Sequence, residues 1–393
     1  MRLRISGIFV ALAMVLAACG TDVPSGALTE LGDNEDELNL IIWAGYAEDG
    51  SNYPEFDWVT PFEEDTGCEV NTTVGNDSAH MVDLMQTGQY DGGSFSGDAT
   101  VRLIAGEDVA PVNVDLIPNY ADVFPALKGL EHNTVDGVPY GTPHGRGANI
   151  MIYNTEFFDE APTSWDVMWD PDSPAAGKIS VYDGNIYIAD AALHLMAAEP
   201  DLGITDPYQL DEQQFQAAID LLNVQNEIVG EYWSGAAFTE QITSFESGDM
   251  VVGTSWGYQF SVLSAEPDNV IAVAEPEEGA TGWSDTWMIS STAEHPNCMY
   301  RWMNHMLSPL ANAQATIYFQ EAAVTQPACD YADTFEDGLY EGHCDTYHAT
   351  DDAYWENVHY WTTPREDCGD DDDATTCKDQ ADWIEAWTQV TGA

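Results

Sequence analysis

The chain has 393 residues, and its 69 acidic side chains against 9 Lys and Arg give a formal net charge of −60 at pH 7. Such a charge repels polyanions, which excludes nucleic acid and anionic membrane faces as partners. The apolar fraction of 44% and the 13 Trp indicate a folded chain with a sizeable core. Because the acids are spread along the whole chain, we interpret them as a surface adapted to high salt rather than a face for one basic partner.

Residues 1–18 have the pattern of an export signal. Arg2 and Arg4 precede an apolar run that is too short to span a bilayer and ends in small residues. The sequence Leu-Ala-Ala-Cys that ends at Cys19 resembles a bacterial lipobox, which implies a diacylglyceryl group on the Cys19 sulfur. Residues 19–37 would then be a flexible tether. We expect a protein anchored outside the cytoplasm, in the periplasm or on the outer face of the cell membrane; the alternative is a plain secretion signal.

Strand-like and helical segments alternate along the rest of the chain, which favours an α/β architecture. The predicted strands are residues 38–43, 68–74, 148–153, 178–182 and 250–252. The predicted helices are residues 59–66 (ended by Gly67), 78–85 (capped by Ser78), 186–198, 211–229 (capped by Asp211), 296–307 and 377–390. Between Gln326 and the last helix we expect an irregular, cysteine-rich segment.

Six cysteines remain after Cys19, and an even number in an exported chain favours disulfides over catalysis or metal binding. Two pairs bracket short acidic segments and are expected to bond locally, which leaves the remaining two cysteines to each other. The expected pairs are Cys329–Cys344, Cys368–Cys377 and Cys68–Cys298. No CxxC motif occurs, so neither a redox role nor a zinc site is expected, and no cofactor is predicted.

A series of motifs follows in an order and spacing that are more specific than any one of them. They are residues 39–46 (NLIIWAGY), 61–70 (PFEEDTGCEV), 94–98 (SFSGD), 138–143 (VPYGTP), 163–167 (TSWDV) and 279–287 (GATGWSDTW). Together they resemble the extracellular solute-binding proteins of ABC importers, in the branch that binds spermidine and putrescine.

The resemblance implies a periplasmic-binding-protein-like α/β fold of type II, with two lobes joined by two crossover strands that close on a ligand by hinge bending. Lobe 1 would comprise residues 38–145 and 280–320, and lobe 2 would comprise residues 146–279. Residues 321–393 would be a cysteine-rich C-terminal extension with a terminal helix. The implied role is that of a monomer, without covalent chemistry, that captures a polyamine in the interlobe cleft and delivers it to a permease and its ATPase subunit.

The resemblance also implies a set of ligand contacts. A polyamine needs carboxylates at the spacing of its amines, and aromatic faces along its methylenes and ammonium groups. The positions that match the family's contacts are Trp43, Tyr46, Ser96, Asp98, Asp183, Tyr187, Trp256, Trp283, Asp285 and Glu321. Trp283 and Asp285 are the strongest match. Tyr187 stands where a carboxylate is frequent in the family, and Glu321 stands where an aromatic residue is usual.

Arg146 lies at the first predicted crossover, close to the expected ligand. A fixed cation there repels a polyamine unless it points away or is neutralised by an acid. Alternatively, its guanidinium binds the carboxylate of a zwitterionic amine such as a betaine or an amino-acid derivative. Arg146 is therefore a further candidate ligand-binding residue, and a zwitterionic amine is the alternative ligand.

Two other classes of function compete with a binding protein. Gly253-Thr-Ser-Trp-Gly257 matches the nucleophile elbow of serine hydrolases, with Ser255 followed in the chain by Asp285 and His295. No Gly-rich oxyanion segment precedes it, so a hydrolase is the less favoured reading. A structural or adhesive lipoprotein is the third class. No HExxH occurs, and the acidic run at 370–373 lacks the spacing of a calcium loop, so no metal site is predicted.

Overall fold

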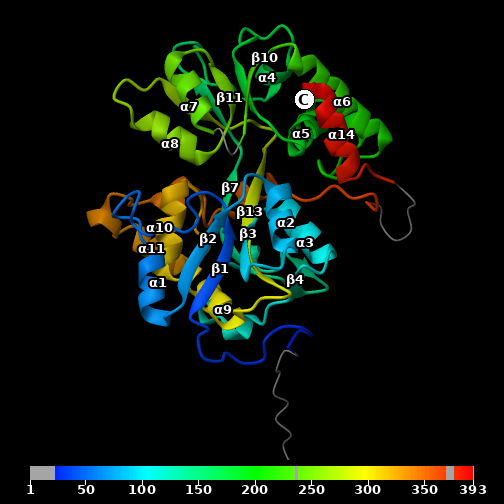
Figure 1. Ribbon diagram of the computed structural model, residues 1–393. Coiled ribbons are helices and arrows are strands. Elements are labelled where there is room, and N and C mark those ends of the chain that lie inside the picture. Colours follow the sequence, from blue (N-terminus) through cyan, green and yellow to red (C-terminus); the bar gives the residue numbers. More distant parts are fainter. Residues whose placement is uncertain (1–22, 235–237, 369–375, 393) are drawn as a thin grey trace, which may run out of the picture.

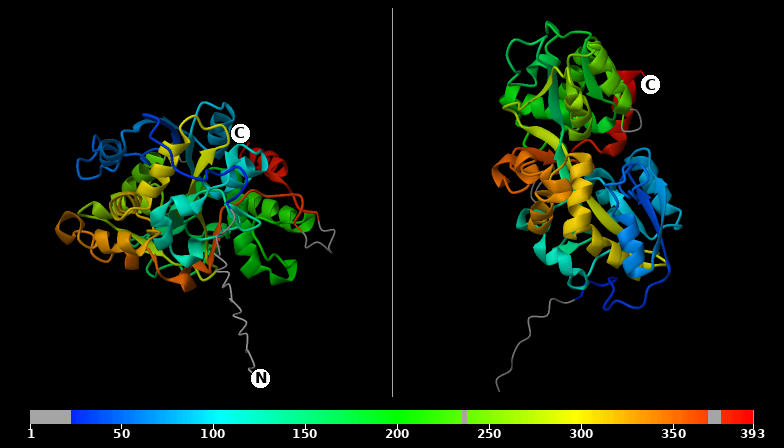
Figure 2. Two further views of the ribbon diagram at one scale, coloured as in Figure 1. Left: turned by 90° about the horizontal axis from the view of Figure 1, so that it is seen from below. Right: turned by 90° about the vertical axis from the view of Figure 1, so that its left-hand side faces the viewer.

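The computed structural model describes residues 23–234, 238–368 and 376–392. The predicted signal peptide and Cys19 lie outside the described residues. Two α/β lobes stand one above the other, and strands β7 (Thr142–Ala148) and β13 (Ala280–Ser290) run between them (Figure 1). The right-hand view of Figure 2 shows the same separation into lobes from the side. The two-lobed α/β fold predicted from the sequence is confirmed.

Lobe 1 is built on a mixed sheet whose described strands run in the order β14–β13–β3–β1–β2. Strand β1 pairs in parallel with β2 and β3, and β13 runs antiparallel to β3, β4 and β7. The strands are β1 (Glu37–Ile42), β2 (Glu69–Val74), β3 (Gly92–Phe95), β4 (Val109–Ala110) and β14 (Val358–Tyr360), with the hairpin β5 (Thr134–Val135) and β6 (Val138–Pro139) nearby. Leu38, Leu40 and Ile41 of β1 are fully buried, as expected of a parallel strand covered on both faces.

Helices cover this sheet and supply most of the lobe 1 core. They are α1 (Val59–Thr66), α2 (Ser78–Gln86), α3 (Gly97–Ala105), α9 (Pro296–Met306), α10 (Pro309–Phe319), α11 (Gln326–Ala332), α12 (His343–Thr346) and α13 (Asp352–Trp355). Helix α9 buries Met299, Trp302 and Met306 against the sheet, whereas its opposite face is polar. The 3.6-residue spacing of these apolar residues is what places the helix on the core.

Lobe 2 has a second sheet, with described strands in the order β10–β9–β11–β8–β12. The strands are β8 (Ile150–Asn154), β9 (Ile179–Tyr182), β10 (Val229–Trp233), β11 (Val252–Ser255) and β12 (Ile271–Ala274). The helices are α4 (Asp166–Trp169), α5 (Ile188–Ala198), α6 (Glu212–Asn226), α7 (Phe238–Ser247), α8 (Gly257–Ala265) and α14 (Gln380–Thr391). Helix α5 is apolar on nearly every face and is buried along most of its length, as such a helix must be.

The segment beyond α10 belongs to both lobes. Cys329, Phe335 and Trp355 pack in the lobe 1 core, and β14 then pairs in parallel with the start of β13. After β14 the chain crosses a third time, and Trp383 and Trp387 of α14 lie in the lobe 2 core. Figure 1 shows this crossing as the orange-red segment that leads up to the red helix α14.

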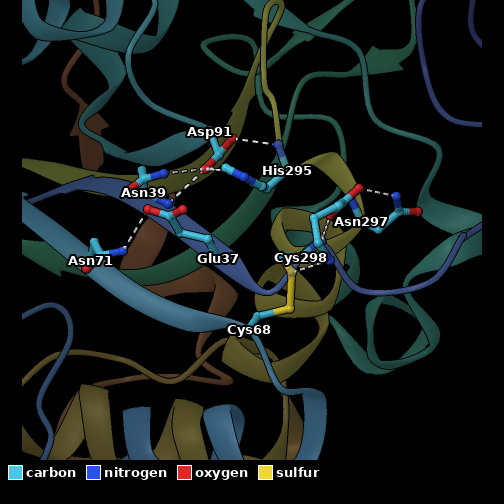
Figure 3. Close-up of polar contacts among 9 residues, drawn as sticks. Glu37, Asn39, Cys68, Asn71, Asp91, His295, Asn297 and Cys298 are labelled. Atoms are coloured by element: carbon cyan, nitrogen blue, oxygen red, sulfur yellow. Dashed lines mark hydrogen bonds and ion pairs between the residues drawn. A yellow bond between two sulfur atoms is a disulfide. The ribbon is translucent and has the colours of Figure 1, made fainter.

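The predicted disulfides Cys68–Cys298, Cys329–Cys344 and Cys368–Cys377 are present. The first joins the start of β2 to helix α9 (Figure 3). Near it, the buried carboxylate of Asp91 accepts hydrogen bonds from the Asn39 backbone (2.8 Å) and from the His295 backbone (2.8 Å), as Figure 3 also shows. These contacts hold the sheet of lobe 1 to the start of α9.

The predicted tether, residues 19–37, is not free over its whole length. The carboxylate of Glu35 accepts hydrogen bonds from the backbone N–H groups of Asn297 (3.1 Å) and Cys298 (2.9 Å). These groups open helix α9, where the unpaired N–H groups and the positive end of the helix dipole favour an anion. The side chain of Asn113 also donates to the carbonyl of Leu28 (2.9 Å). The segment from about residue 28 onward therefore lies against lobe 1.

Of two N-terminal helix caps predicted from the sequence, one is confirmed and one is wrong. Asp211 caps α6 as predicted, because its carboxylate accepts from the Gln214 backbone N–H (2.9 Å) and the Gln214 side chain returns to the Asp211 backbone (3.0 Å). The predicted Ser78 cap is wrong. Asp77 caps α2 instead, since its backbone is extended and its carboxylate accepts from the His80 N–H (2.8 Å).

We expect each disulfide to stabilise the fold by an amount that grows with the logarithm of the length of the loop that it closes. Replacing Cys68 and Cys298 with Ala should lower the free energy of unfolding by about 5 kcal/mol, because this bond closes the longest loop. The same change at Cys329 and Cys344, which are also buried but are separated by 15 residues, should cost about 3 kcal/mol. Denaturant unfolding at constant high salt measures both. Equal losses would contradict an effect on the unfolded chain.

Candidate ligand site

The carboxyl ends of strands in both lobes supply the residues of the site. Trp43 follows β1, Ser96 follows β3, Asp183 follows β9 and Trp256 follows β11. Ligands of α/β proteins bind outside the carboxyl ends of parallel strands, where loops leave the sheet. Strand β13 passes through this region and carries Trp283 and Asp285.

Asp285 is a buried carboxyl group that is only 2% exposed. The hydroxyl of Tyr46 donates to its Oδ2 at 2.9 Å. Burial raises the pKa of Asp285 to about 6, although the nearby Ser96 and Tyr46 hydroxyls act to lower it. Among the described groups, Oδ1 of Asp285 has no hydrogen-bond partner. An anionic carboxylate with a free oxygen can therefore accept from a cationic donor that enters the site.

Glu321 is a second buried carboxyl group beside Asp285. The Trp283 indole donates to its Oε2 at 3.1 Å, and Nε2 of His144 lies 3.5 Å from its Oε1. Burial, together with the charge of Asp285, raises the pKa of Glu321 to about 8. Burial lowers the pKa of His144 to about 3. At neutral pH the Glu321–His144 contact thus joins two uncharged groups.

The tautomer of His144 follows from its other neighbour. The indole of Trp287 donates to Nδ1 of His144 at 3.0 Å, and an indole N–H can only donate. The proton of the neutral imidazole therefore resides on Nε2, which faces Glu321. The ring of His144 also stacks on Tyr46 with centroids 4.1 Å apart, so that Glu321 and Asp285 are joined through two packed rings.

Four aromatic rings next to these carboxyl groups form a closed series of contacts. Around the ring the centroid separations are 5.7 Å for Tyr182–Trp256, 5.8 Å for Trp256–Trp283, 6.0 Å for Trp283–Trp361 and 5.8 Å for Trp361–Tyr182. A square with such sides has its centre about 4 Å from each centroid, within the ~6 Å over which an aromatic face attracts a cation. We call these four residues the aromatic box.

Trp361 comes from the third crossing of the chain. Its backbone N–H donates to the carbonyl of Gly282 at 2.7 Å, and the hydroxyl of Thr363 donates to the carbonyl of Asp98. A Cβ atom on Gly97 would lie 1.8 Å from the Trp361 carbonyl oxygen, so this close approach requires glycine. Likewise, a Cβ atom on Gly147 would lie 2.2 Å from the Trp283 ring.

The other predicted ligand residues lie at different distances from this centre. Trp43 is half-buried against the lobe 1 core, and its indole acts with the Ser96 and Tyr46 hydroxyls to lower the pKa of Asp285. Asp98 accepts from the Ser78 hydroxyl (3.0 Å) and has a pKa that burial raises. Asp183 accepts from the Trp387 indole of α14 at 3.0 Å. Tyr187 is 1% exposed in the lobe 2 core, where its hydroxyl accepts from Gln225 (3.0 Å). The structure thus does not bring Tyr187 to the box.

Arg146 is buried away from Asp285, beneath the segment that precedes the third crossing. Its Nη1 donates to the Tyr360 hydroxyl (3.2 Å) and its Nη2 to the Ala349 carbonyl (2.9 Å). The guanidinium carbon lies 4.1 Å from the centroid of the Trp355 ring. The guanidinium is therefore held by hydrogen bonds and a ring face, in a place separate from the aromatic box.

The three residues of the hydrolase alternative do not meet. The strand-to-helix turn that the motif predicts is present between β11 and α8, but Oγ of Ser255 donates to Gln241 (3.1 Å) inside lobe 2. Nδ1 of His295 lies 2.9 Å from Asp91 in lobe 1, and Asp285 accepts from Tyr46. Within the described residues, no cluster of three or more His, Cys, Asp or Glu could hold a metal ion.

Sequence reasoning missed three residues of the site: Tyr182, His144 and Trp361. Tyr182 ends a predicted strand next to Asp183, and that position was a usable signal. His144 precedes Arg146 by two residues on β7, at the place where the pairing with β13 shifts its register. Trp361 lies in a segment that was expected to be irregular, and nothing in its surroundings distinguishes it from the other tryptophans of the chain.

Comparisons with known proteins agree on one family for this chain. The family described as "Bacterial extracellular solute-binding protein" matches residues 57–336. A putrescine/cadaverine-binding protein of Pseudomonas aeruginosa is 24% identical over 289 residues, which cover 69% of this chain and 75% of that protein. A putrescine-binding periplasmic protein from another strain of that species is 25% identical over 306 residues, which cover 74% of this chain and 78% of that protein.

Solved structures match over almost the whole chain. The TpPotD lipoprotein of Treponema pallidum has a TM-score of 0.70 at 18% identity, and the match covers 91% of this chain and all of that one (100%). A putative spermidine/putrescine ABC transporter protein from Listeria monocytogenes also has a TM-score of 0.70, at 17% identity, and the match covers 90% of this chain and 98% of that one. These matches establish the two-lobed fold.

The raised pKa of Glu321 predicts that the folded protein loses stability as the pH rises. An unfolded glutamate ionises near pH 4.5 and the folded one near 8, so the group lowers stability increasingly as pH rises through this window. Glu321→Gln, which keeps an acceptor for Trp283, should raise the melting temperature by several degrees at pH 9 and change it little at pH 4.5. Thermal unfolding at both pH values measures this, with the exposed Glu64→Gln as control. A gain that is equal at both pH values would contradict the prediction.

Proposed function

Since the chain belongs to the family of bacterial extracellular solute-binding proteins, we propose that it captures a polyamine of the spermidine/putrescine type between its lobes. It would deliver this ligand to a membrane permease driven by an ATPase subunit, as substrate-binding proteins of ABC importers do. The observation that carries the ligand class is the buried carboxylate of Asp285, whose Oδ1 has no hydrogen-bond partner among the described groups and which lies beside the aromatic box. No covalent chemistry is part of this role.

The proposed binding mode assigns each part of a polyamine to a part of the site. One ammonium group donates to Asp285, and the adjoining methylenes lie between the rings of the aromatic box. The ring faces also attract the ammonium, and more strongly once closure of the lobes removes water. A second ammonium would reach Asp98 or Asp183, at the rim toward lobe 2. Glu321 would remain protonated in the absence of ligand, because its pKa is raised by burial.

We further propose that a lipid on Cys19 anchors the protein at the membrane. The relative from Treponema pallidum is described as a lipoprotein. In the described part of this chain no helix is both long enough and apolar enough to span a bilayer. The chain enters lobe 1 on the side away from lobe 2, as Figure 1 shows for its dark blue segment, so an anchor there would leave the interlobe site unobstructed.

We attribute the acidic surface to adaptation to high salt. Among the described residues, a single Lys or Arg forms an ion pair with a carboxylate, Lys378 with Glu212, so most acidic side chains are balanced by solvent cations. Screening by salt removes the repulsion that so many like charges would otherwise cause.

Asp285→Asn tests the amine-binding role directly. Removal of one partner of a buried charge pair costs about 3–5 kcal/mol, so putrescine or spermidine should bind roughly 100- to 4,000-fold more weakly. Affinity of the wild type should also fall as the pH drops below about 6, where Asp285 becomes protonated, and the variant should lack this step. Calorimetry in high salt measures both effects. Asp65→Asn, at an exposed position on α1, is the matched control, and a loss of only a few-fold would reject Asp285 as the amine anchor.

Trp361→Leu tests the contribution of the third crossing. Loss of one face of the aromatic box should weaken polyamine binding by about 1–2 kcal/mol, or roughly 5- to 30-fold. Trp361→Phe, which retains a ring, should restore most of the affinity. The same calorimetric titration distinguishes the two variants, and equal affinities for Leu and Phe would show that the ring does not contact the ligand.

A further inference from the structure

A cavity of about 510 Å³ lies between the lobes at the crossover strands. Its walls come from the β7–β8 junction, the β12–β13 junction, the end of α10 and residues 346–358. Trp283 and Glu321 line both this cavity and the polyamine site. Asp285 and the other three rings of the aromatic box do not line it. The cavity is therefore an adjoining space, separated from the box by the Trp283 ring and the Glu321 carboxyl group.

Arg146 lines this cavity and is only 1% exposed. A guanidinium has five N–H donors, and those of Arg146 meet two protein acceptors, the Tyr360 hydroxyl and the Ala349 carbonyl. Its Nε has no hydrogen-bond partner among the described groups. No carboxylate oxygen in the described part of the chain lies within ion-pair distance of Arg146, even though the chain is strongly acidic. Asp352 acts on the guanidinium from beyond ion-pair distance, so the buried cation has no carboxylate in direct contact among the described residues.

The other ionisable groups that line the cavity do not neutralise the guanidinium of Arg146. Glu275 and Glu277 are exposed at its rim, where solvent and salt screen them. Glu321 is inside, but its carboxyl group is uncharged at neutral pH because burial raises its pKa to about 8. The remaining walls include the rings of Trp283 and Trp355. The interior thus contains one fixed positive charge in mostly apolar surroundings.

We infer that this cavity is a second binding site and that Arg146 binds a small carboxylate in it. A planar carboxylate matches the guanidinium in geometry and supplies the acceptor that Nε lacks. The ring of Trp355 beneath the guanidinium fixes its plane. The volume of about 510 Å³ is within the range of small-molecule sites and exceeds what a simple carboxylate needs.

The carboxylate has two possible sources. It is either a separate molecule or one end of a zwitterion whose ammonium group reaches Asp285 past Trp283. The second source would modify the proposed polyamine function, whereas the first is independent of it. Both sources require the same guanidinium, so one set of variants serves for both.

The experiment follows thermal unfolding and tryptophan fluorescence while sodium acetate replaces sodium chloride at constant ionic strength. Wild type should show a saturable rise in melting temperature, which Arg146→Gln should abolish. Arg301→Gln, which removes an arginine of α9 outside the cavity, is the matched control and should respond like wild type. If Arg146→Gln does not fold, Val273→Trp narrows the cavity without removing the guanidinium and should abolish the response.

Further titrations separate the sources. If acetate binds equally well with and without saturating putrescine, the carboxylate is a separate ligand. If 5-aminopentanoate displaces both acetate and putrescine, one zwitterion spans the two spaces. An acetate response that is absent in wild type, or unchanged in Arg146→Gln, overturns the inference. In Asp285→Asn the acetate response should persist while putrescine binding is lost, so failure of the polyamine proposal is seen separately.

Discussion

The candidate site depends on strand β13 more than on any other element. It pairs with β3, β4, β7 and β14 and passes from one lobe toward the other, so it is fixed from both sides along its length. Trp283 and Asp285 lie two residues apart on it, and the pairing with β7 shifts its register between Ser284 and Thr286, at Asp285. Because the strand is immobilised by its neighbours, the carboxylate of Asp285 stays desolvated at a defined place, and its raised pKa follows from that burial.

The electrostatics of the site contrast with those of the surface. Outside, most of the 69 acidic side chains of the chain face water and salt. Inside, two carboxyl groups lie close together without a cation, and the pKa of each is raised. Proximity of like charges in a medium of low polarity keeps one of them protonated. At neutral pH the site therefore has one negative charge, on Asp285, that a cationic ligand can neutralise. Arg146 does not neutralise it, because the contact with Trp355 holds the guanidinium elsewhere.

Much of the fold could be predicted because its signals are local. Buried strands, the Asp211 cap and the cysteine pairs follow from short patterns in the sequence, and the motifs from Asn39 to Trp287 indicated the family. The site was predicted less completely, since contacts across lobes depend on long-range packing. Tyr187 follows Asp183 closely in sequence, yet the turn before α5 directs it into the lobe 2 core. The place of Trp361 in the site could not be predicted, because it depends on the third crossing of the chain, which no local sequence pattern indicates.

The third crossing has a consequence for how the protein is made. Trp383, Trp387 and Val390 belong to the core of lobe 2, although the rest of that lobe precedes them by many residues. Lobe 1 likewise needs β13 between β3 and β14 to complete its sheet. Lobe 2 cannot finish its core while residues beyond 380 are still inside the cell, whereas lobe 1 has its core and its sheet once β14 is outside. An export route that threads the chain unfolded would therefore let lobe 1 mature first, and lobe 2 would stay incomplete until α14 has emerged.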